Sequence, residues 1–491
     1  MMSLTRSSLT KVSLFRVSGS LNKVLANQLF KRTAMAICIT TVISSLLSSC
    51  ATSSLSRDEE AKAATSASLP DLPSQWASIQ QRVGEVKVSW LEKLNDPALA
   101  LLVLEAQKNN RNLQVMAASV DGARALANQA ASSLSPQLGA SVGSTSGGAV
   151  AGSGSNNFNV GLQASWEADL WGRIRSGNLA AQENVVAAEA EYKFAQYSLA
   201  ANVAKTYFVA IEANKQLEIA QRSVATIVET NHIVQVQFDN GLANQQNISL
   251  AKADLASAQD GLVSSKAGQR DATRSLELLL GRYPSAELGI VQSLPSLPNI
   301  LPAGIPSQLL ERRPDLVAAE RKVAAAFNRL DAAKAAKLPN LSLSGSLGGS
   351  SNSLSNILNP ANLAWQAIGS LVAPIIDGGR LDAQVEAATA DQKSAVAGYA
   401  QTALNAFADV ERALDQGSVL RKRVTALTTV LVESEKALKI ANLQFDEGEI
   451  SLLDVLILQQ RVFSARSNLL SINRASLTQF VDLNLALGGS W

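Results

Sequence analysis

The tetrapeptide Phe238-Asp239-Asn240-Gly241 returns 207 residues later as Phe445-Asp446-Glu447-Gly448. In both places the glycine closes a long run of helix-forming residues. Glycine adopts the left-handed backbone that ends a helix and lets the chain reverse into the next one. The pair therefore predicts two helical hairpins with the same turn.

The duplication extends outward from these turns over most of the chain. At the same spacing of 207 residues, Gly172-Arg173 matches Gly379-Arg380 and Leu280-Gly281 matches Leu487-Gly488. Further upstream the spacing is 203 residues, where Arg111-Asn112-Leu113 matches Pro314-Asp315-Leu316 and Pro136-Gln137-Leu138 matches Pro339-Asn340-Leu341. Because these landmarks keep their order with one insertion of four residues, the chain is a tandem structural repeat.

Each copy has the same expected plan of a helix, two strands, a long helix, a glycine turn and a return helix. The first copy spans 96–283, with a helix over 97–133, strands at about 137–146 and 157–167, a long helix over 174–240 and a return helix over 242–281. A Pro-rich connector covers 284–311. The second copy spans 312–491, with a helix over 314–337, strands at about 339–348 and 363–376, a long helix over 381–447 and a return helix over 449–488.

The predicted strands alternate between apolar and polar residues. Every second residue from Phe158 to Trp166 is apolar, and Asn, Gly, Gln and Ser fill the other positions. Period-two alternation gives a strand one apolar and one polar face. In a soluble sandwich the apolar face would be the core. Here the polar face carries almost no charge, which is typical of the wall of a membrane pore.

The long helices favour a tubular architecture. Residues 178–240 contain no Gly or Pro, and a helix of that length is about 95 Å long. Many alanines let such helices pack closely in a coiled-coil-like wall. Four strands cannot sit alone in a bilayer, because an open sheet leaves edge amides unpaired in lipid. Three or four copies would give twelve or sixteen strands around a lumen, and this reasoning does not choose between them.

The N-terminus has the pattern of an export signal. Residues 1–49 carry six cations and no acid, and an apolar core from Ala34 to Leu47 precedes Cys50. The sequence Leu47-Ser48-Ser49-Cys50 resembles a bacterial lipobox, and this resemblance makes Cys50 the lipidated first residue of the mature protein. Residues 50–95 are then expected to be a lipidated N-terminal extended segment. The covalent lipid is the one non-protein group expected, and no other cofactor is.

The chain offers little catalytic chemistry. His232 is the only histidine and is interpreted as an exposed helical residue, and Cys50 is the one cysteine left after the signal. These counts exclude a His/Cys metal site and a Cys–His nucleophile. Ser249-Leu250-Ala251-Lys252 matches S-x-x-K, but the companion motifs of serine acyl-enzymes are absent. We therefore expect neither an enzyme nor a metal site, and the lack of a basic face gives no support for nucleic-acid binding.

Several segments are similar to the TolC/OprM-type outer membrane factor family, in its RND efflux outer-membrane lipoprotein (NodT-like) branch. They are Asn95-Asp96-Pro97 with Leu99, Glu311-Arg312-Arg313-Pro314-Asp315-Leu316 with Ala319-Glu320, and Phe445-Asp446-Glu447-Gly448. The resemblance implies a mainly α fold with a small transmembrane β part. Long antiparallel helices would form an α-barrel in a homotrimer, and four strands per chain would form a twelve-stranded β-barrel.

The same resemblance implies an exit duct of a tripartite efflux system in the outer membrane. Its partners would be a periplasmic adaptor, an inner-membrane RND pump and the outer-membrane lipid. The adaptor-contact tips would be Asn240, Gly241, Leu242, Glu447, Gly448 and Glu449. The periplasmic constriction would be formed by Leu453, Asp454, Gln246 and Asn247. Some relatives carry another aspartate three residues after the position of Asp454, where this chain has Ile457.

Other interpretations remain open from the sequence. The chain could be the outer-membrane component of a type I protein secretion system, a lipid-anchored trimeric stalk or adhesin, or a helical lipoprotein hydrolase without recognisable chemistry. The tips could be ordinary helix–helix turns, Leu453 plain helix packing and Asp454 a solvated charge. The exported substrates, the partner pump and the start codon are not encoded in any pattern found here.

Overall fold

A computed structural model describes residues 54–73, 75–78, 90–148, 155–290, 293–298 and 306–489. The chain divides into two compact units, residues 1–58 and 59–491. In the first unit, residues 54–58 begin helix α2. The second unit contains all the other elements. The expected signal peptide over 1–49 and its neighbour Cys50 lie outside the described residues.

The short helix α3 (Trp90–Lys93) precedes the first copy. The first copy contains two helices and two strands before its long hairpin, namely α4 (Pro97–Asn109), α5 (Arg111–Ser132), β1 (Gln137–Gly147) and β2 (Ser155–Ala168). The single helix expected over 97–133 is wrong, because it breaks at Asn110, whose backbone is extended with φ −65° and ψ 124°. The Asn110 side chain accepts a 3.1 Å bond from the Leu113 amide and so starts a second helix.

The long hairpin of the first copy is formed by α6 (Arg173–Asp239) and α7 (Gln245–Leu279). The long helix begins and ends within one residue of the expected 174–240. The return helix begins three residues later than the expected 242, because residues 240–244 form the turn and a new N-terminal cap. The lack of Gly and Pro over the middle of α6 lets its hydrogen-bond ladder run unbroken.

The second copy repeats this plan. Its elements are α8 (Pro306–Arg312), α9 (Pro314–Ala335), β3 (Asn340–Ser351), two short 3-10 turns (Leu354–Asn356 and Pro360–Asn362), β4 (Leu363–Val372), α10 (Arg380–Asp446) and α11 (Leu452–Ala486). The return helix again begins three residues later than expected. The connector expected over 284–311 ends in helix α8. The strand expected over 363–376 ends at Val372, because Pro374 has no N–H to continue the ladder.

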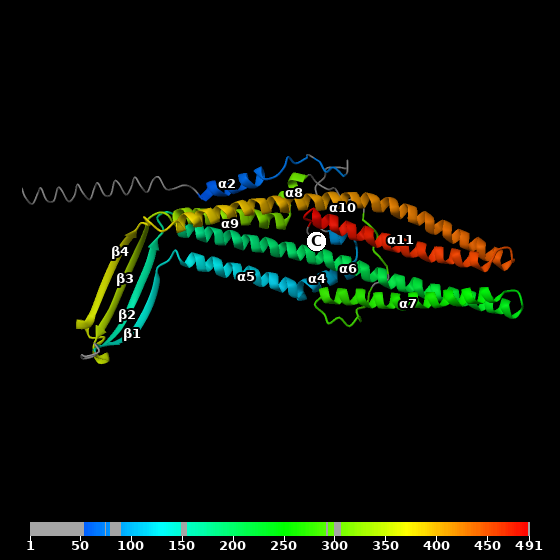
Figure 1. Ribbon diagram of the computed structural model, residues 1–491, viewed down its shortest axis with the longest axis horizontal. Helices are drawn as coiled ribbons and strands as arrows, with labels where there is room; N and C mark the ends of the chain where they lie inside the picture. The colour runs from blue at the N-terminus through cyan, green and yellow to red at the C-terminus, as the bar shows by residue number, and fades with distance from the viewer. Residues whose placement is uncertain are drawn as a thin grey trace, which may run out of the picture. The chain divides into compact units, whose positions relative to one another are not determined.

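The four strands form one antiparallel sheet in the order β1-β2-β3-β4. Within residues 59–491, the sheet lies beside one end of α6 and α10, and the α6–α7 and α10–α11 turns lie at the other end (Figure 1). Helices α5 and α9 flank α6 on the sheet side, whereas α7 and α11 flank it on the side of the turns. No helix in the described residues is both long and apolar enough to cross a membrane.

The N-terminal segment is helical in part, which corrects the extended segment expected over 50–95. Helix α2 (Ser54–Ala67) places Ala61 against Val323 and Tyr399. Farther along, the Trp76 ring lies 6.3 Å from the ring of Phe407. Both contacts bury apolar surface that α9 and α10 would otherwise expose, and this burial explains why residues 59–73 and 75–78 lie along these helices.

The main core lies where α4, α6, α7 and α11 meet. Tyr207, Phe208 and Ile211 of α6 are almost fully buried there. Trp90 of α3 completes this core from the N-terminal segment. Burial of Tyr207, together with the Asp96 carboxylate that accepts a hydrogen bond from its hydroxyl group, raises the pKa of this tyrosine.

Candidate functional site

The two predicted tips have the same backbone. Gly241 and Gly448 adopt φ values of +76° and +77°. The amide of Leu242 donates to the Gln237 carbonyl at 2.8 Å, and the amide of Glu449 donates to the Gln444 carbonyl at 2.8 Å. This bond after a left-handed glycine is the Schellman motif, which satisfies the last carbonyls of a helix. The duplicated sequence therefore folds into a duplicated turn.

The chemistry of the two tips differs. The first presents Asn240 and Leu242, and 81% of the Leu242 side chain is exposed. The second presents Glu447 and Glu449, which are also exposed. One tip thus offers an apolar side chain and an amide, and the other offers two carboxylates.

Two of the predicted constriction residues cap the return helices. Asp454 accepts bonds from the amide and hydroxyl of Ser451, at 3.1 and 2.6 Å, while the Asp454 amide donates to the Ser451 hydroxyl. Asn247 and Asn244 make the matching reciprocal pair in the first copy, at 3.2 and 3.0 Å. These pairs are capping boxes, which satisfy the first amides of a helix. The three-residue spacing of each pair is visible in the sequence, but the two capping boxes were not predicted from it.

The first turns of the two return helices share a small core. Its members are Val234, Ile248, Ala251, Leu452 and Leu456. Leu453 and Asp454 point away from this core and are exposed, Leu453 to 50%. Gln246 is exposed in the equivalent first turn of α7. The structure thus brings the two predicted sets to neighbouring helix starts, with Leu453, Asp454 and Gln246 exposed on the protomer surface.

The sheet has one apolar and one polar face, because the register keeps residues of like character opposite one another. Leu162 lies opposite Ala140 and Leu347, and Leu347 lies opposite Trp365. On the other face, Gln163 lies opposite Gly139 and Ser346. Large side chains of the apolar face are exposed, including Val142 at 80% and Trp365 at 78%. A chain that exposes such a face needs an apolar environment to cover it.

Two neighbouring strands approach each other closely at a pair of glycines. Gly161 and Gly348 lie opposite each other on the polar face. A Cβ on Gly348 would stand 2.5 Å from the Val160 carbonyl oxygen and 2.8 Å from the Gly161 Cα. Backbones this close leave room for no side chain at this position of the polar face.

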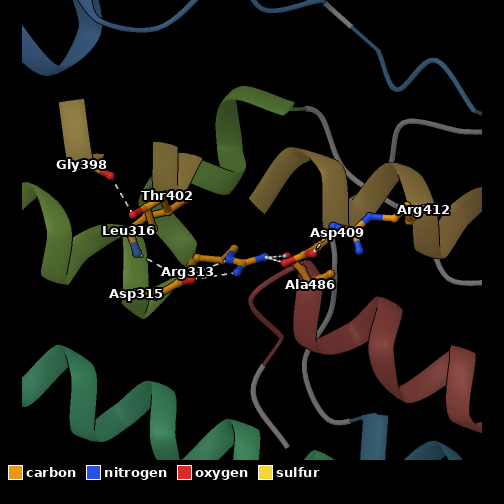
Figure 2. A network of polar contacts seen from close by, with 8 residues as sticks. All are labelled: Arg313, Asp315, Leu316, Gly398, Thr402, Asp409, Arg412 and Ala486. Atoms are coloured by element: carbon orange, nitrogen blue, oxygen red, sulfur yellow. Dashed lines mark hydrogen bonds and ion pairs between the residues drawn. The ribbon is translucent and has the colours of Figure 1, made fainter. Parts of the chain in front are cut away.

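A buried arginine, Arg313, joins helices α9, α10 and α11 of the second copy (Figure 2). The Arg313 side chain is 6% exposed and makes a two-pronged pair with Asp315, at 3.0 and 2.7 Å. It also donates to the Ala486 carbonyl at 3.2 Å and lies 3.5 Å from an Asp409 oxygen. Arg313 therefore ties the start of α9 to the end of α11 and to the side of α10.

The first copy has the same junction with simpler chemistry. The Asn110 side chain donates to the Leu279 carbonyl at 3.0 Å, between the start of α5 and the end of α7. Gly281 follows that helix with φ +73°, and a Cβ there would stand 2.6 Å from the Asn109 carbonyl oxygen. In the second copy, a Cβ on Gly488 would stand 3.1 Å from the Arg312 carbonyl carbon. Each return helix is thus followed by a glycine that packs against the residue two positions before helix α5 or α9.

A buried carboxylate holds the beginning of the connector. Glu277 is 2% exposed and accepts bonds from the amides of Ala286, Glu287 and Leu288, at 2.7, 3.0 and 3.0 Å. Burial raises the pKa of Glu277, but these three amides and the nearby Arg282 outweigh it and hold the pKa below its ordinary value. No sequence pattern predicts this clamp, because the three amides belong to an irregular loop.

The histidine and the acidic residues form no metal cluster in the described part of the chain. His232 is exposed on α6, as the sequence predicted. No group of three or more His, Cys, Asp or Glu residues that could hold a metal ion occurs within the described ranges.

The model of the family described as outer membrane efflux protein matches residues 102–282 and 305–489. The chain is 32% identical over 407 residues to the cation efflux system protein CusC of Escherichia coli O6:H1, covering 82% of this chain and 88% of that protein. It is 29% identical over 406 residues to the probable outer membrane lipoprotein SilC of Salmonella typhimurium, covering 82% of this chain and 88% of that protein.

The fold is similar to that of a solved channel. The outer-membrane channel OprN aligns with a TM-score of 0.79 and 28% sequence identity, over 86% of this chain and 99% of that one. These proteins are channel and efflux components of the outer membrane. The family matches include both copies of the repeat, and therefore both tips, both junctions and all four strands.

Proposed function

This chain belongs to the outer membrane efflux protein family, and we propose that it is the outer-membrane exit duct of a tripartite efflux system. In this role it passes substrates from the periplasm to the outside. The relatives are channel proteins rather than enzymes.

The observation that carries the proposal is the sheet. It has an exposed apolar face, an uncharged polar face over most of its length, and two edges, β1 and β4, each paired on one side within the chain. In a bilayer those edges must pair with other strands, because lipid supplies no hydrogen bonds. Closure across three copies gives twelve strands, enough for an open lumen lined by the polar face.

The helical part continues this lumen into the periplasm. In the homotrimer, the long helices would form an α-barrel, with a periplasmic adaptor at the tips and an inner-membrane RND pump beyond it. Leu453, Asp454, Gln246 and Asn247 would form the closed constriction. Exposure of Leu453, Asp454 and Gln246 on the protomer supports this proposal, since a ring across subunits needs side chains that are not packed inside one subunit.

The lipid anchor on Cys50 is a further part of the proposal. The relative SilC is itself named a probable outer membrane lipoprotein. The anchor and the barrel would be independent attachments to the membrane. We expect the Cys50→Ser variant to lose its acyl chain and stay in the membrane fraction, and its complete release would count against the barrel.

Electron microscopy of the detergent-extracted mature protein tests the architecture. A hollow threefold particle longer than about 100 Å, from the length of a 67-residue helix, with a detergent belt at one end, is the expected result. A thin solid rod without a belt would favour the stalk or adhesin. A compact globule would contradict the duct altogether.

Cysteine labelling separates a duct from a solid stalk in the intact protein. Single cysteines at Asp454 and Gln246 should react with a small water-soluble reagent, because a lumen is hydrated. A matched cysteine at buried Leu456 should stay unreactive. Equal protection of all three positions would contradict the lumen. Reconstitution with RND and type I inner-membrane pumps, scored by transport, then distinguishes efflux from type I secretion.

A further inference from the structure

All four strands together carry one charged residue. It is Glu167, near the end of β2, on the polar face that also carries Gln163 and Ser165. The rest of that face consists of Gly, Ser, Thr, Asn and Gln with a few small or apolar residues at β4. A lone carboxylate in such a lining would dominate the local electrostatic potential.

This carboxylate is matched by an arginine on the following helix. The Arg173 guanidinium donates to both Glu167 oxygens, at 3.1 and 2.8 Å. The Glu167 side chain is 28% exposed and the Arg173 side chain 42%, so both charges reach the solvent at the base of the sheet. They line a cavity of about 400 Å³ between the sheet and the helices, together with Asp169 and Arg380.

Two neighbouring acids at this level also have a basic partner. Arg175 lies 3.6 Å from Asp169, and Lys337 pairs with Asp382. Asp377 instead accepts bonds from the Gly379 and Leu381 amides at 3.1 and 2.9 Å. The pairing of Glu167 is the one that lies on the polar face of the sheet.

Arg173 is the first residue of α6, where a cation opposes the helix dipole. The Asp169 carboxylate offsets this charge at the helix start, because it accepts bonds from the Ile174 and Arg175 amides at 3.1 and 2.8 Å. The Arg173 side chain itself donates to Glu167.

We propose that Arg173 is the counter-charge that cancels Glu167 and so keeps the exit lumen from selecting between cations and anions. The inference rests on the proposed function, because it takes the polar face as the wall of a water-filled lumen. Removal of Arg173 unmasks one carboxylate per chain and makes the lumen favour cations. Removal of Glu167 unmasks one guanidinium per chain and makes it favour anions.

The test measures local potential with a cysteine at Ser165, which is exposed two residues from Glu167 on the same face. The full-length protein in outer-membrane vesicles is treated from outside, at pH 8, with cationic and anionic methanethiosulfonates of similar size. The parent without the added cysteine gives the background. Since about 7 Å along a strand is within the Debye length at 0.1 M salt, an unmasked carboxylate remains visible at this position.

Arg173→Gln should raise the cationic-to-anionic rate ratio roughly three- to fivefold, from the screened interaction of a unit charge at this range. Glu167→Gln should lower the ratio, and the double variant and Arg173→Lys should restore the parent value. A ratio that stays within about twofold of the parent in both Gln variants would overturn the inference. These two single variants move the ratio in opposite directions, so a general loosening of the fold cannot imitate the result.

A second cysteine, at Ala164 on the apolar face, shows whether a negative result contradicts only the charge-cancelling role or the proposed duct itself. In a duct, Ser165→Cys reacts much faster than Ala164→Cys with both reagents, because one position faces water and the other lipid. Equal rates at the two positions would contradict the water-filled lumen itself. Fast reaction at Ser165→Cys with an unchanged ratio in the Arg173 and Glu167 variants would contradict the charge-cancelling role alone.

Discussion

Asn110 and Arg313 occupy equivalent places in the two copies, and each donates a side-chain hydrogen bond to a carbonyl in the last turn of a return helix. An uncharged amide does this in the first copy and a buried guanidinium in the second. The guanidinium needs a carboxylate partner, which Asp315 supplies. The geometry of the junction is therefore conserved between the copies although its electrostatics is not.

Arg313→Met should destabilise the protein strongly. It leaves the Asp315 carboxylate and the Ala486 carbonyl without their partner, and breaking a buried pair in this way costs about 3 kcal/mol or more. Thermal unfolding of the detergent-solubilised protein measures the loss. The matched control is Arg412→Ala, because Arg412 is 75% exposed and pairs with Asp409 within one helix. Equal melting temperatures for both variants would contradict the junction.

Gly281→Ala should destabilise more than Gly488→Ala. Both glycines have positive φ, but the added Cβ meets a carbonyl oxygen at 2.6 Å in the first case and backbone at 3.1 Å in the second. We expect a cost of about 2 kcal/mol or more for Gly281→Ala from the backbone conformation and the contact. Gly268→Ala is the control, since this glycine lies inside α7 with open space around it. That substitution should stabilise by about 0.5–1 kcal/mol.

Glu277→Gln should release the start of the connector. The pKa of Glu277 is lowered in the folded protein, so its contribution to stability is present at neutral pH and is lost as the pH falls through this lowered pKa. Tryptic cleavage after Arg282 should become faster in the variant at pH 7. Glu287→Gln is the control, because that side chain is exposed and makes no bond to the loop amides. Slow cleavage in both variants would show that the carboxylate is not the clamp.

Asp454→Asn separates charge from helix capping at the proposed constriction. Asparagine keeps the capping box, as Asn247 does in the first copy, so stability should change little. Planar-bilayer recordings should show a closed state with higher leak and weaker cation preference. Asp454→Ala removes both functions and should also cost about 1 kcal/mol. If neither variant alters conductance, the constriction lies elsewhere.

The long elements could be predicted from the sequence because their signals are local. The glycine-free, proline-free interior of α6 and the glycine at 241 fixed that helix to within one residue. The alternation from Phe158 to Trp166 predicted two faces, and the strand register confirms them. The family resemblance was confirmed as well.

The remaining features lack Gly or Pro signals or depend on partners that are distant in the sequence. Asn110 breaks a helix without Gly or Pro, and its side chain both caps α5 locally and donates to a carbonyl 169 residues away. The Glu277 clamp depends on amides of an irregular loop. Helix α2 was expected to be extended, since its weak amphipathicity gives little local signal and its contacts with Val323 and Tyr399 are remote.

The two tips share one backbone and differ in side chains, with Asn240 and Leu242 on one and Glu447 and Glu449 on the other. In the proposed trimer, the two kinds of tip would alternate around a rim of six tips. The backbone of the rim would then have sixfold symmetry, whereas its charge would have only threefold symmetry. A partner that binds at every tip would therefore meet two chemically unlike sites in turn. Such a partner must bind either through contacts that do not depend on the side chains or in two inequivalent arrangements.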